Sequence, residues 1–169
     1  GEPMSHEAFD ALVGDVMPLV EMVDAQQLDG VPMTFFEVMT GLAFEAFAQA
    51  PVDVAVVEVG LGGTWDATNV VDAQVAVVCP IDLDHTHLLG DTIAEIAGEK
   101  AGIIKEGSVA VLAQQQPDAA RVLAERCREV CARMVREGVE FGLIGRTAAV
   151  GGQVLRLETA EGPVDDLLL

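Results

Sequence analysis

Val75-Ala76-Val77-Val78-Cys79 is a short run of apolar residues with no polar position inside it. A continuous apolar run of this length is typical of a strand in a parallel sheet that is covered on both faces. Residues 109–112 form a second run of the same kind, and residues 52–57 form a third that is continuous in its second half. Together the three runs predict the centre of a parallel sheet.

Helical patterns surround these runs. Ser5 is a candidate N-cap, and Thr34 with Glu37 and Thr92 with Glu95 form the T-x-x-E pattern of a capping box. Helices are predicted for four segments, namely residues 5–24, 35–49, 92–101 and 118–136. Strands that alternate with helices predict an α/β fold with a doubly wound, mostly parallel sheet.

The pattern changes toward the C-terminal end. Residues 139–143 are predicted as a fourth strand, and residues 150–158 and 164–169 resemble antiparallel strands around a Gly162-Pro163 turn. We therefore expect residues 1–169 to form one domain, in which residues 148–169 are a small antiparallel β appendage.

Composition excludes several classes of protein. Of the 169 residues, 51% are hydrophobic, which indicates a folded domain with a core. The apolar runs are too short to cross a bilayer, and Gly1-Glu2-Pro3 does not begin a signal peptide, so a cytoplasmic location is the default expectation. The three cysteines are interpreted as reduced thiols.

The charge of the chain is strongly negative and unevenly distributed. The formal net charge is −19, and residues 1–99 contain 18 acidic residues but no lysine or arginine. Such a field repels nucleic acid and anionic membranes, so neither is expected as a partner. An anionic substrate would need local help from a metal ion or from backbone amides.

Glu58 is the first candidate for chemistry. It ends an apolar run, where a charge is costly unless it is paired or bound to a metal. Gly60, Gly62 and Gly63 follow it and permit a tight turn and a close approach of a ligand. The alternative is a purely structural turn capped by Asp66 or Asn69.

His85 and Lys100 are the other two candidates. His85 follows a predicted strand, and imidazole is an ordinary ligand of divalent ions, although a lone loop histidine is also common as a surface residue. An ammonium group repels a metal, but a lysine that has reacted with carbon dioxide carries a carbamate with two oxygens and a negative charge. The alternative for Lys100 is a surface lysine paired with Glu95 or Glu99.

Two segments resemble a known family. Residues 58–69, E-V-G-L-G-G-x-x-D-A-T-N, and residues 84–105, D-H-x-x-x-L-G-x-T-x-x-x-I-A-x-E-K-A-G-I-I-K, are similar to folylpolyglutamate synthases, including the bifunctional dihydrofolate synthase members. These are Mur ligase-like, ATP-dependent amide ligases. The likeness extends more loosely over residues 1–169 and is nearest to actinobacterial members.

The resemblance implies roles for individual residues. Residues that match Glu58 and His85 bind Mg²⁺ in the family, and the residue that matches Lys100 is a carbamylated lysine, so these three are the expected metal and catalytic residues. The pterin part of the substrate is contacted by segments that match Thr34, Phe35, Phe36 and Glu37, and by segments that match Trp65, Asp66 and Ala67.

The resemblance also implies a reaction. ATP would phosphorylate the γ-carboxyl group of tetrahydrofolate, and the amine of L-glutamate would displace phosphate from the acyl phosphate. Folate, L-glutamate and ATP are therefore the expected partners and Mg²⁺ the expected cofactor, while dihydropteroate as a second acceptor is left open.

The sequence departs from the family in two respects. Position 64 is Thr, where relatives usually carry Arg, and no G-x-x-x-x-G-K-[ST] phosphate loop occurs in the chain. We therefore expect a partial central domain without the N-terminal phosphate-loop strand and the C-terminal ligase domain, inactive by itself and prone to self-association through an open sheet edge. The alternatives are a non-catalytic fragment or subunit, or a Mur-type ligase with another acceptor.

Overall fold

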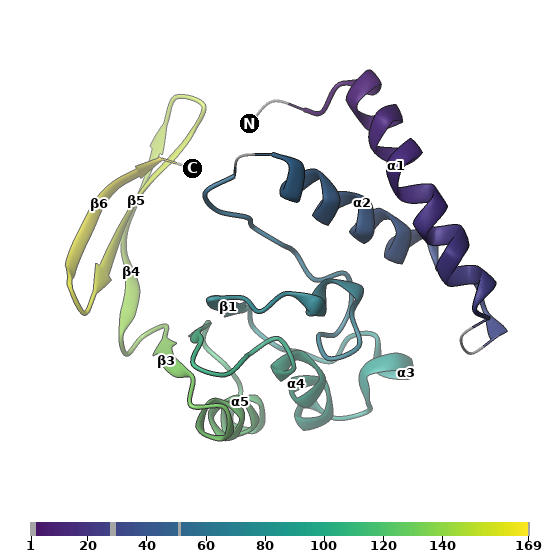
Figure 1. Cartoon of the computed structure of the whole chain (residues 1–169). Helices are drawn as coiled ribbons and strands as arrows, with labels where there is room; N and C mark the ends of the chain where they lie inside the picture. The colour runs from purple at the N-terminus through teal and green to yellow at the C-terminus, as the bar shows by residue number, and fades with distance from the viewer. Residues whose placement is uncertain (1–2, 28–29, 51, 169) are drawn as a thin grey trace. The chain divides into compact units, whose positions relative to one another are not determined.

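The computed structural model describes residues 3–27, 30–50 and 52–168 (Figure 1). The chain divides into two compact units. The first contains Gly1–Gly60 and Asp66–Val70, and the second contains Leu61–Trp65 and Val71–Leu169. In the described part of the chain, no helix is long and apolar enough to cross a membrane.

Among its described residues, the first unit contains the helices α1 (His6–Ala25) and α2 (Phe35–Gln49) and a short 3₁₀ helix, η2 (Ala67–Val70). Helices α1 and α2 pack through a small apolar cluster, and η2 follows the glycine-rich turn. The cluster is centred on Leu12, Val16, Val20 and Leu42. Both helices agree with the prediction, and Ser5 caps α1 by accepting a hydrogen bond from the Ala8 backbone N–H at 3.2 Å.

The predicted capping box at the start of α2 is confirmed. The Glu37 N–H donates to Thr34 Oγ1 at 3.2 Å, and the Thr34 N–H donates to Glu37 Oε2 at 2.7 Å. The Thr34 hydroxyl also donates to Glu37 Oε2 at 2.7 Å, and the donations from the backbone and hydroxyl of Thr34 lower the pKa of Glu37 below its ordinary value. Because two N–H groups at this helix end are satisfied by side chains, α2 begins at a defined residue.

Removing the cap should destabilise the first unit. We expect Thr34→Ala to lower the free energy of unfolding by about 1 kcal/mol, because the N3 amide loses its acceptor. Thr34→Ser retains the hydroxyl and should stay close to the parent. Urea unfolding monitored by circular dichroism measures both variants, and equal losses in the two would show that the hydroxyl does not carry the effect.

The second unit contains the predicted parallel sheet. Strands β1 (Val75–Val78), β2 (Val109–Leu112) and β3 (Arg133–Arg136) pair in the order β1-β2-β3, and every pair is parallel. Helices α3 (Thr86–Leu89), α4 (Ile93–Ala101) and α5 (Pro117–Glu129) provide the crossovers. The α/β class and the parallel sheet are confirmed.

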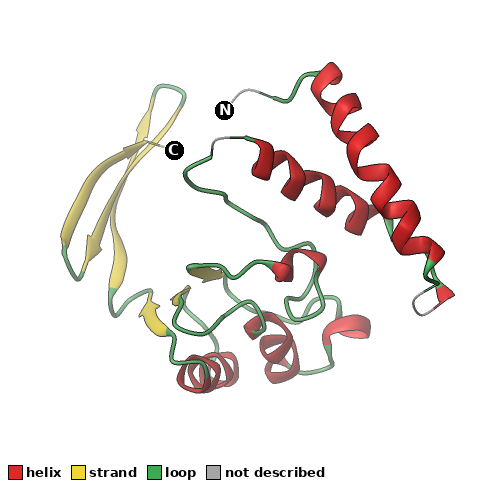
Figure 2. Ribbon diagram, in the orientation of Figure 1, coloured by secondary structure: helices red, strands yellow, loops and turns green. Residues whose placement is uncertain are grey.

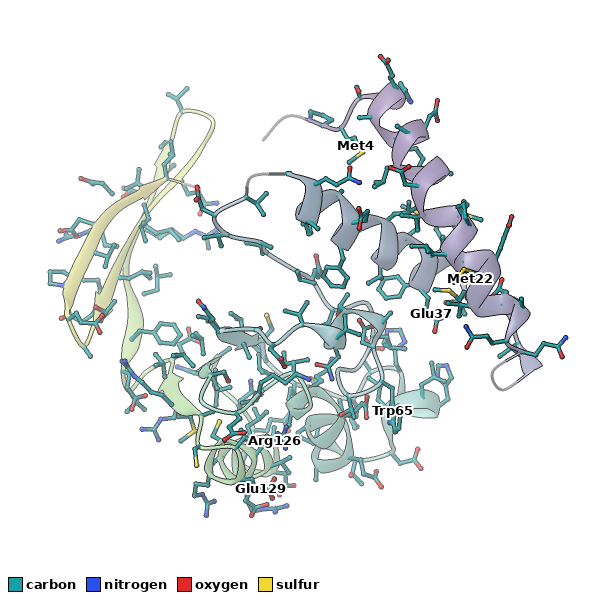
Figure 3. All side chains as sticks on the ribbon, in the orientation of Figure 1. Met4, Met22, Glu37, Trp65, Arg126 and Glu129 are labelled. Atoms are coloured by element: carbon teal, nitrogen blue, oxygen red, sulfur yellow. The ribbon has the colours of Figure 1, made fainter. Side chains whose placement is uncertain are left out.

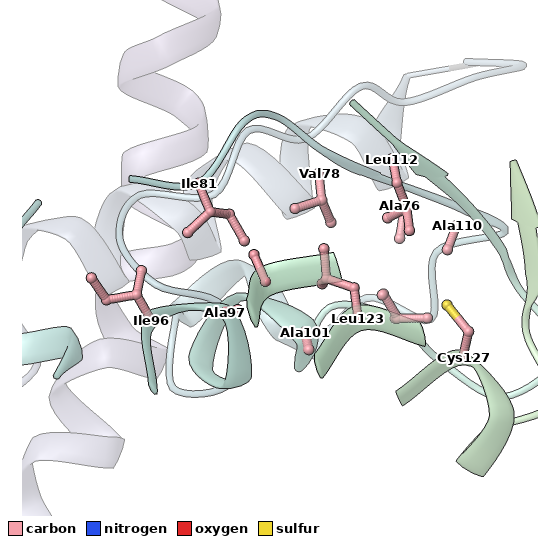
Figure 4. Close-up of a cluster of buried hydrophobic side chains, with 12 residues drawn as sticks. Ala76, Val78, Ile81, Ile96, Ala97, Ala101, Ala110, Leu112, Leu123 and Cys127 are labelled. Atoms are coloured by element: carbon pink, nitrogen blue, oxygen red, sulfur yellow. The ribbon is translucent and has the colours of Figure 1, made fainter. Parts of the chain in front are cut away.

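The main core lies between one face of this sheet and the helices α4 and α5 (Figure 4). Ile96, Ile104 and Leu123 are its largest fully buried side chains. Arg126 reaches back from α5, where its Nε and Nη2 donate to the Ile104 carbonyl oxygen at 3.2 and 3.0 Å. This bond ties the segment after α4 to α5.

The antiparallel segment is also confirmed, but it begins earlier than residue 148. Strands β4 (Phe141–Ala149), β5 (Gly152–Thr159) and β6 (Gly162–Leu168) form a separate antiparallel sheet in the order β4-β5-β6 (Figure 2). The predicted fourth strand at 139–143 is confirmed for residues 141–143, which begin β4, while residues 139 and 140 form a turn. Residues 162 and 163 start β6 and do not form the turn itself.

The predicted helix at 118–136 is too long. Helix α5 ends at Glu129, Cys131 adopts a left-handed backbone conformation with φ +52°, and residues 133–136 become β3. Arg133 and Arg136 are the first and last residues of β3, and their spacing of three is also typical of one face of a helix. Hydrogen bonding to β2 makes residues 133–136 a strand instead of a helix, and the local sequence pattern gives no sign of this pairing.

Two predictions about the strands are wrong. Residues 52–57 form no strand among the described residues, and Val54 and Val56 are 79% and 90% exposed. A strand forms only when a neighbour accepts its hydrogen bonds, and an apolar pattern cannot supply that neighbour. In β1, Val75 and Val77 are 52% and 60% exposed, so only one face of that strand is covered.

Candidate active site

The two family-like segments meet in the second unit. Residues 61–65, which we call the glycine turn, lie against the C-terminal end of α4. The Thr64 N–H and Oγ1 both donate to the Glu99 carbonyl oxygen at 3.0 Å, and the Trp65 N–H donates to Glu99 Oε1 at 3.2 Å. The turn that carries Trp65 is thus attached to the helix turn that carries Lys100.

Two glycines make this close approach possible. A Cβ atom on Gly63 would lie 2.7 Å from the Glu99 carbonyl oxygen and 2.9 Å from that of Lys100. A Cβ atom on Gly102 would lie 2.2 Å from Thr64 Oγ1 and 2.6 Å from Thr64 Cα. Because backbone atoms stand in both positions, no larger residue fits without separating the turn from the helix.

Lys100 occupies the last turn of α4, where a cation interacts favourably with the helix dipole. The carboxylates proposed as its alternative partners are engaged elsewhere. Glu95 accepts hydrogen bonds from the Thr92 hydroxyl and from the backbone N–H groups of Thr92 and Asp91, and these bonds lower its pKa. The Glu99 carboxylate accepts from Trp65. Among the ion pairs of the described residues, none joins Lys100 to Glu95 or Glu99.

His85 has an unusual backbone conformation. It precedes α3 with φ +49° and ψ +38°, in the left-handed region, and its side chain makes no capping hydrogen bond. Such a conformation costs about 1–2 kcal/mol for a residue other than glycine. Its N–H donates to Asp84 Oδ1 at 2.8 Å, and its Nε2 lies 3.7 Å from Asp84 Oδ2. The imidazole is 53% exposed and is presented to solvent on a strained loop.

Glu58 belongs to the first unit, where it lines an apolar pocket of about 250 Å³. The pocket is walled mainly by α2 and by the extended segment before the glycine turn. Its lining residues are Phe36, Met39, Thr40, Ala43, Phe44, Phe47, Val56, Val57, Glu58 and Thr68. One predicted pterin contact, Phe36, and one predicted metal ligand, Glu58, therefore line the same pocket.

The predicted substrate residues differ in their surroundings. Phe35 and Trp65 are 81% and 89% exposed, and Figure 3 shows the side chain of Trp65. Asp66 Oδ1 accepts from the N–H and Oγ1 of Thr68 at 2.9 and 2.5 Å and so caps η2. The structural alternative for this part of the motif is thus correct for Asp66, whatever else the residue contacts.

The expected metal ligands are distributed over both units, with Glu58 in the first and His85 and Lys100 in the second. Within the described residues, no group of three or more His, Cys, Asp and Glu side chains could hold a metal ion. A lysine carbamate is not among those residue types. The shared metal site therefore stays a prediction.

Glu99 is the residue that sequence reasoning missed. It was considered only as a partner for Lys100, whereas its carbonyl and carboxylate oxygens hold the glycine turn. Its position beside Lys100 in the family-like segment was the available signal. The contact joins residues 35 positions apart, which no local pattern indicates.

Comparison with known proteins shows which chains this one is similar to. The chain is 48% identical to a dihydrofolate synthase/folylpolyglutamate synthase of Mycobacterium tuberculosis over 100% of its own length and 37% of the relative's. It is 40% identical to the Bacillus subtilis protein of the same name over 99% of the chain and 39% of that relative. The chain is homologous to the folylpolyglutamate synthases. No family model matches it.

Solved structures of folylpolyglutamate synthases have the same fold. The M. tuberculosis synthase complexed with ADP and AMPPCP, an ATP analogue, superposes with a TM-score of 0.90 at 48% identity, over 99% of this chain and 39% of that one. The apo form of the Lactobacillus casei synthase gives 0.88 at 38% identity, over 98% and 40%. A further neighbour, at 0.89 and 38% identity, is a complex with AMPPCP and folate that covers 98% of this chain.

These matches confirm the resemblance to folylpolyglutamate synthases, including the likeness to an actinobacterial member. The chain spans less than half the length of the relatives and structures that it matches. What the complete synthases bind and catalyse is accordingly a matter of proposal for this chain.

Proposed function

We propose that this chain is the part of an ATP- and Mg²⁺-dependent amide ligase that joins L-glutamate to the γ-carboxyl group of a tetrahydrofolate. The observation that carries the proposal is the docking of the glycine turn on α4, since it brings together two segments that both resemble the folylpolyglutamate synthases. Homology over the full length of the chain supports it.

The candidate residues fit a divalent cation in their chemistry. Carboxylate and carbamate oxygens are the hard donors that Mg²⁺ prefers, and imidazole nitrogen is an ordinary ligand of divalent metal ions in general. Glu58 and His85 are exposed. Glu58, His85 and carbamylated Lys100 would hold the ion. When bound, Mg²⁺ would neutralise charge on the phosphoryl group that is transferred.

The chain's own side chains would bind the folate. The exposed rings of Phe35 and Trp65 offer flat apolar surfaces for a pterin, and Phe36 walls the pocket that Glu58 also lines. Thr34, Glu37, Asp66 and Ala67 complete the proposed set of contacts. ATP would convert the γ-carboxyl group to an acyl phosphate, and the amine of glutamate would then attack the carbonyl carbon and release phosphate.

The competing proposal is a non-catalytic piece of such a ligase. The sequence favours it in one respect, because no glycine-rich phosphate loop is present to hold ATP. Several expectations stay predictions. They are dihydropteroate as a second acceptor, self-association through a sheet edge, a cytoplasmic location, and the lack of nucleic-acid and membrane partners.

A chimera tests the proposal. The matching segment of the mycobacterial relative is replaced by this chain, and ATP-dependent incorporation of labelled glutamate into tetrahydrofolate is measured with and without Mg²⁺. We expect activity that needs both ATP and Mg²⁺. Dihydropteroate serves as the parallel acceptor, and the parent synthase is the reference for folding and rate.

Two results would contradict the proposal. A chimera that unfolds cooperatively like the parent but incorporates no glutamate would favour the non-catalytic piece, particularly if isothermal titration of the chain with Mg²⁺ and ATP gives no heat. Hydrolysis of ATP without glutamylation of either acceptor would favour a Mur-type ligase with another acceptor.

A further inference from the structure

Glu99 binds the glycine turn through both its backbone carbonyl and its carboxylate. Its carbonyl oxygen accepts from the Thr64 N–H and hydroxyl, and its carboxylate accepts from the Trp65 N–H. The same carbonyl accepts from the Gly102 N–H at 3.3 Å, so the helix end and the turn share one acceptor. Backbone and side chain of one residue thus bind two successive residues of the turn.

The placement of Glu99 is unfavourable for the helix itself. It lies in the final turn of α4, where the partial negative charge of the helix end repels a carboxylate. A charge-assisted hydrogen bond from a backbone N–H offsets this repulsion. A local conflict of this kind, compensated by one long-range contact, is typical of a functional site.

The position of Thr64 strengthens the same attachment. Its hydroxyl donates to the carbonyl oxygen of Glu99, one of the last in α4. Gly102 leaves room for this hydroxyl, since any Cβ on it would collide with Thr64. The turn is therefore joined to the helix by a hydrogen bond from the Thr64 hydroxyl to the Glu99 backbone, and Gly102 leaves the space that this bond needs.

We propose that Glu99 is a positioning residue that orients Trp65 toward the folate and keeps the turn at a constant distance from Lys100. This inference rests on the proposed function for the identity of the ligand. The orienting contact itself, between Glu99 and the backbone of Trp65, is independent of that function and can be measured separately.

Trp65 offers a direct measurement because it is the only tryptophan of the chain. We expect Glu99→Ala to lower the fluorescence anisotropy of Trp65 toward that of the urea-unfolded chain, since the turn loses its side-chain acceptor. Glu99→Gln keeps an amide oxygen as acceptor and should retain the parent anisotropy. Glu106→Ala removes an exposed acid outside the contact and is the matched control.

The second measurement concerns the ligand. Pteroic acid is titrated into each variant of the chimera, and quenching of Trp65 is followed in a parent whose own tryptophans are replaced by phenylalanine. We expect Glu99→Ala to bind about tenfold more weakly, the factor for losing one hydrogen bond to a charged group. The glutamine variant should recover most of that affinity.

Unchanged anisotropy in a folded Glu99→Ala variant would overturn the inference, as would a glutamine variant as mobile as the alanine variant. Alanine is a strong helix former, so α4 should persist. Should that variant nevertheless fail to fold, Glu99→Asp carries the test, because it keeps the charge but shortens the reach to Trp65. Lowered anisotropy with no pteroic acid binding in any variant would support the positioning contact and contradict the proposed substrate.

Discussion

Lys100→Ala in the chimera should reduce the rate of glutamylation by about 100-fold or more, because charge stabilisation by a bound metal is worth several kcal/mol. The loss should appear mainly in kcat, since Lys100 is proposed to act on the transferred phosphoryl group and not on the pterin. Steady-state kinetics with tetrahydrofolate as the varied substrate measure both parameters.

Lys105 supplies the control, because it is the only other lysine of the chain and lies in the same family-like segment. Lys105→Ala should stay within a few-fold of the parent. Carbon-13 NMR after incubation with labelled bicarbonate should show a carbamate signal in the parent and in the Lys105 variant, and none in the Lys100 variant. A bare amine at saturating bicarbonate would refute the carbamate, and equal rates in both variants would refute a catalytic role for Lys100.

Leu123→Ala should lower the free energy of unfolding by about 3 kcal/mol, within a range of about 2–5 for buried leucines. Leu123 is fully buried between the sheet and α5, where it contributes to the main cluster. Truncation removes apolar contacts and leaves a cavity that close-packed neighbours fill only in part. Urea unfolding followed by circular dichroism gives the difference.

Leu88→Ala is the comparison, because that side chain is 64% exposed in α3 of the same unit. It should change stability by no more than about 0.5 kcal/mol. If the two alanine variants lose equal stability, the second unit does not depend on the core between α4, α5 and the sheet. The same variants also report whether the unit unfolds cooperatively.

Helices with strong local signals could be predicted from the sequence. The capping boxes at Thr34 and Thr92 determine where α2 and α4 begin, since their hydrogen bonds join residues three positions apart. Strands β1 and β2 follow from uninterrupted apolar runs. Strand β3 could not be predicted, because Arg133 and Arg136 interrupt the apolar run that is typical of a buried strand. Its extended conformation depends on pairing with β2.

The strand predicted at residues 52–57 was wrong for the opposite reason, because there the sequence favours a strand that does not form. Their composition favours a strand, but hydrogen bonds to a neighbouring strand decide whether one forms, and none is formed among the described residues. The same limit applies to burial. A valine-rich run indicates that both faces suit a core, yet the outer side chains Val75 and Val77 are covered only if another layer packs on them.

The amino-acid sequence by itself determined which proteins the chain resembles, because two of its segments are long and specific enough to match one family. Local hydrogen bonds and periodicity also determined where α1, α2 and α4 lie. Only the tertiary structure revealed that Glu99 holds the turn bearing Trp65 and that Gly63 and Gly102 permit this contact. These contacts join residues more than 30 positions apart in the chain. No local pattern indicates them, because they form only when the fold brings the turn against α4.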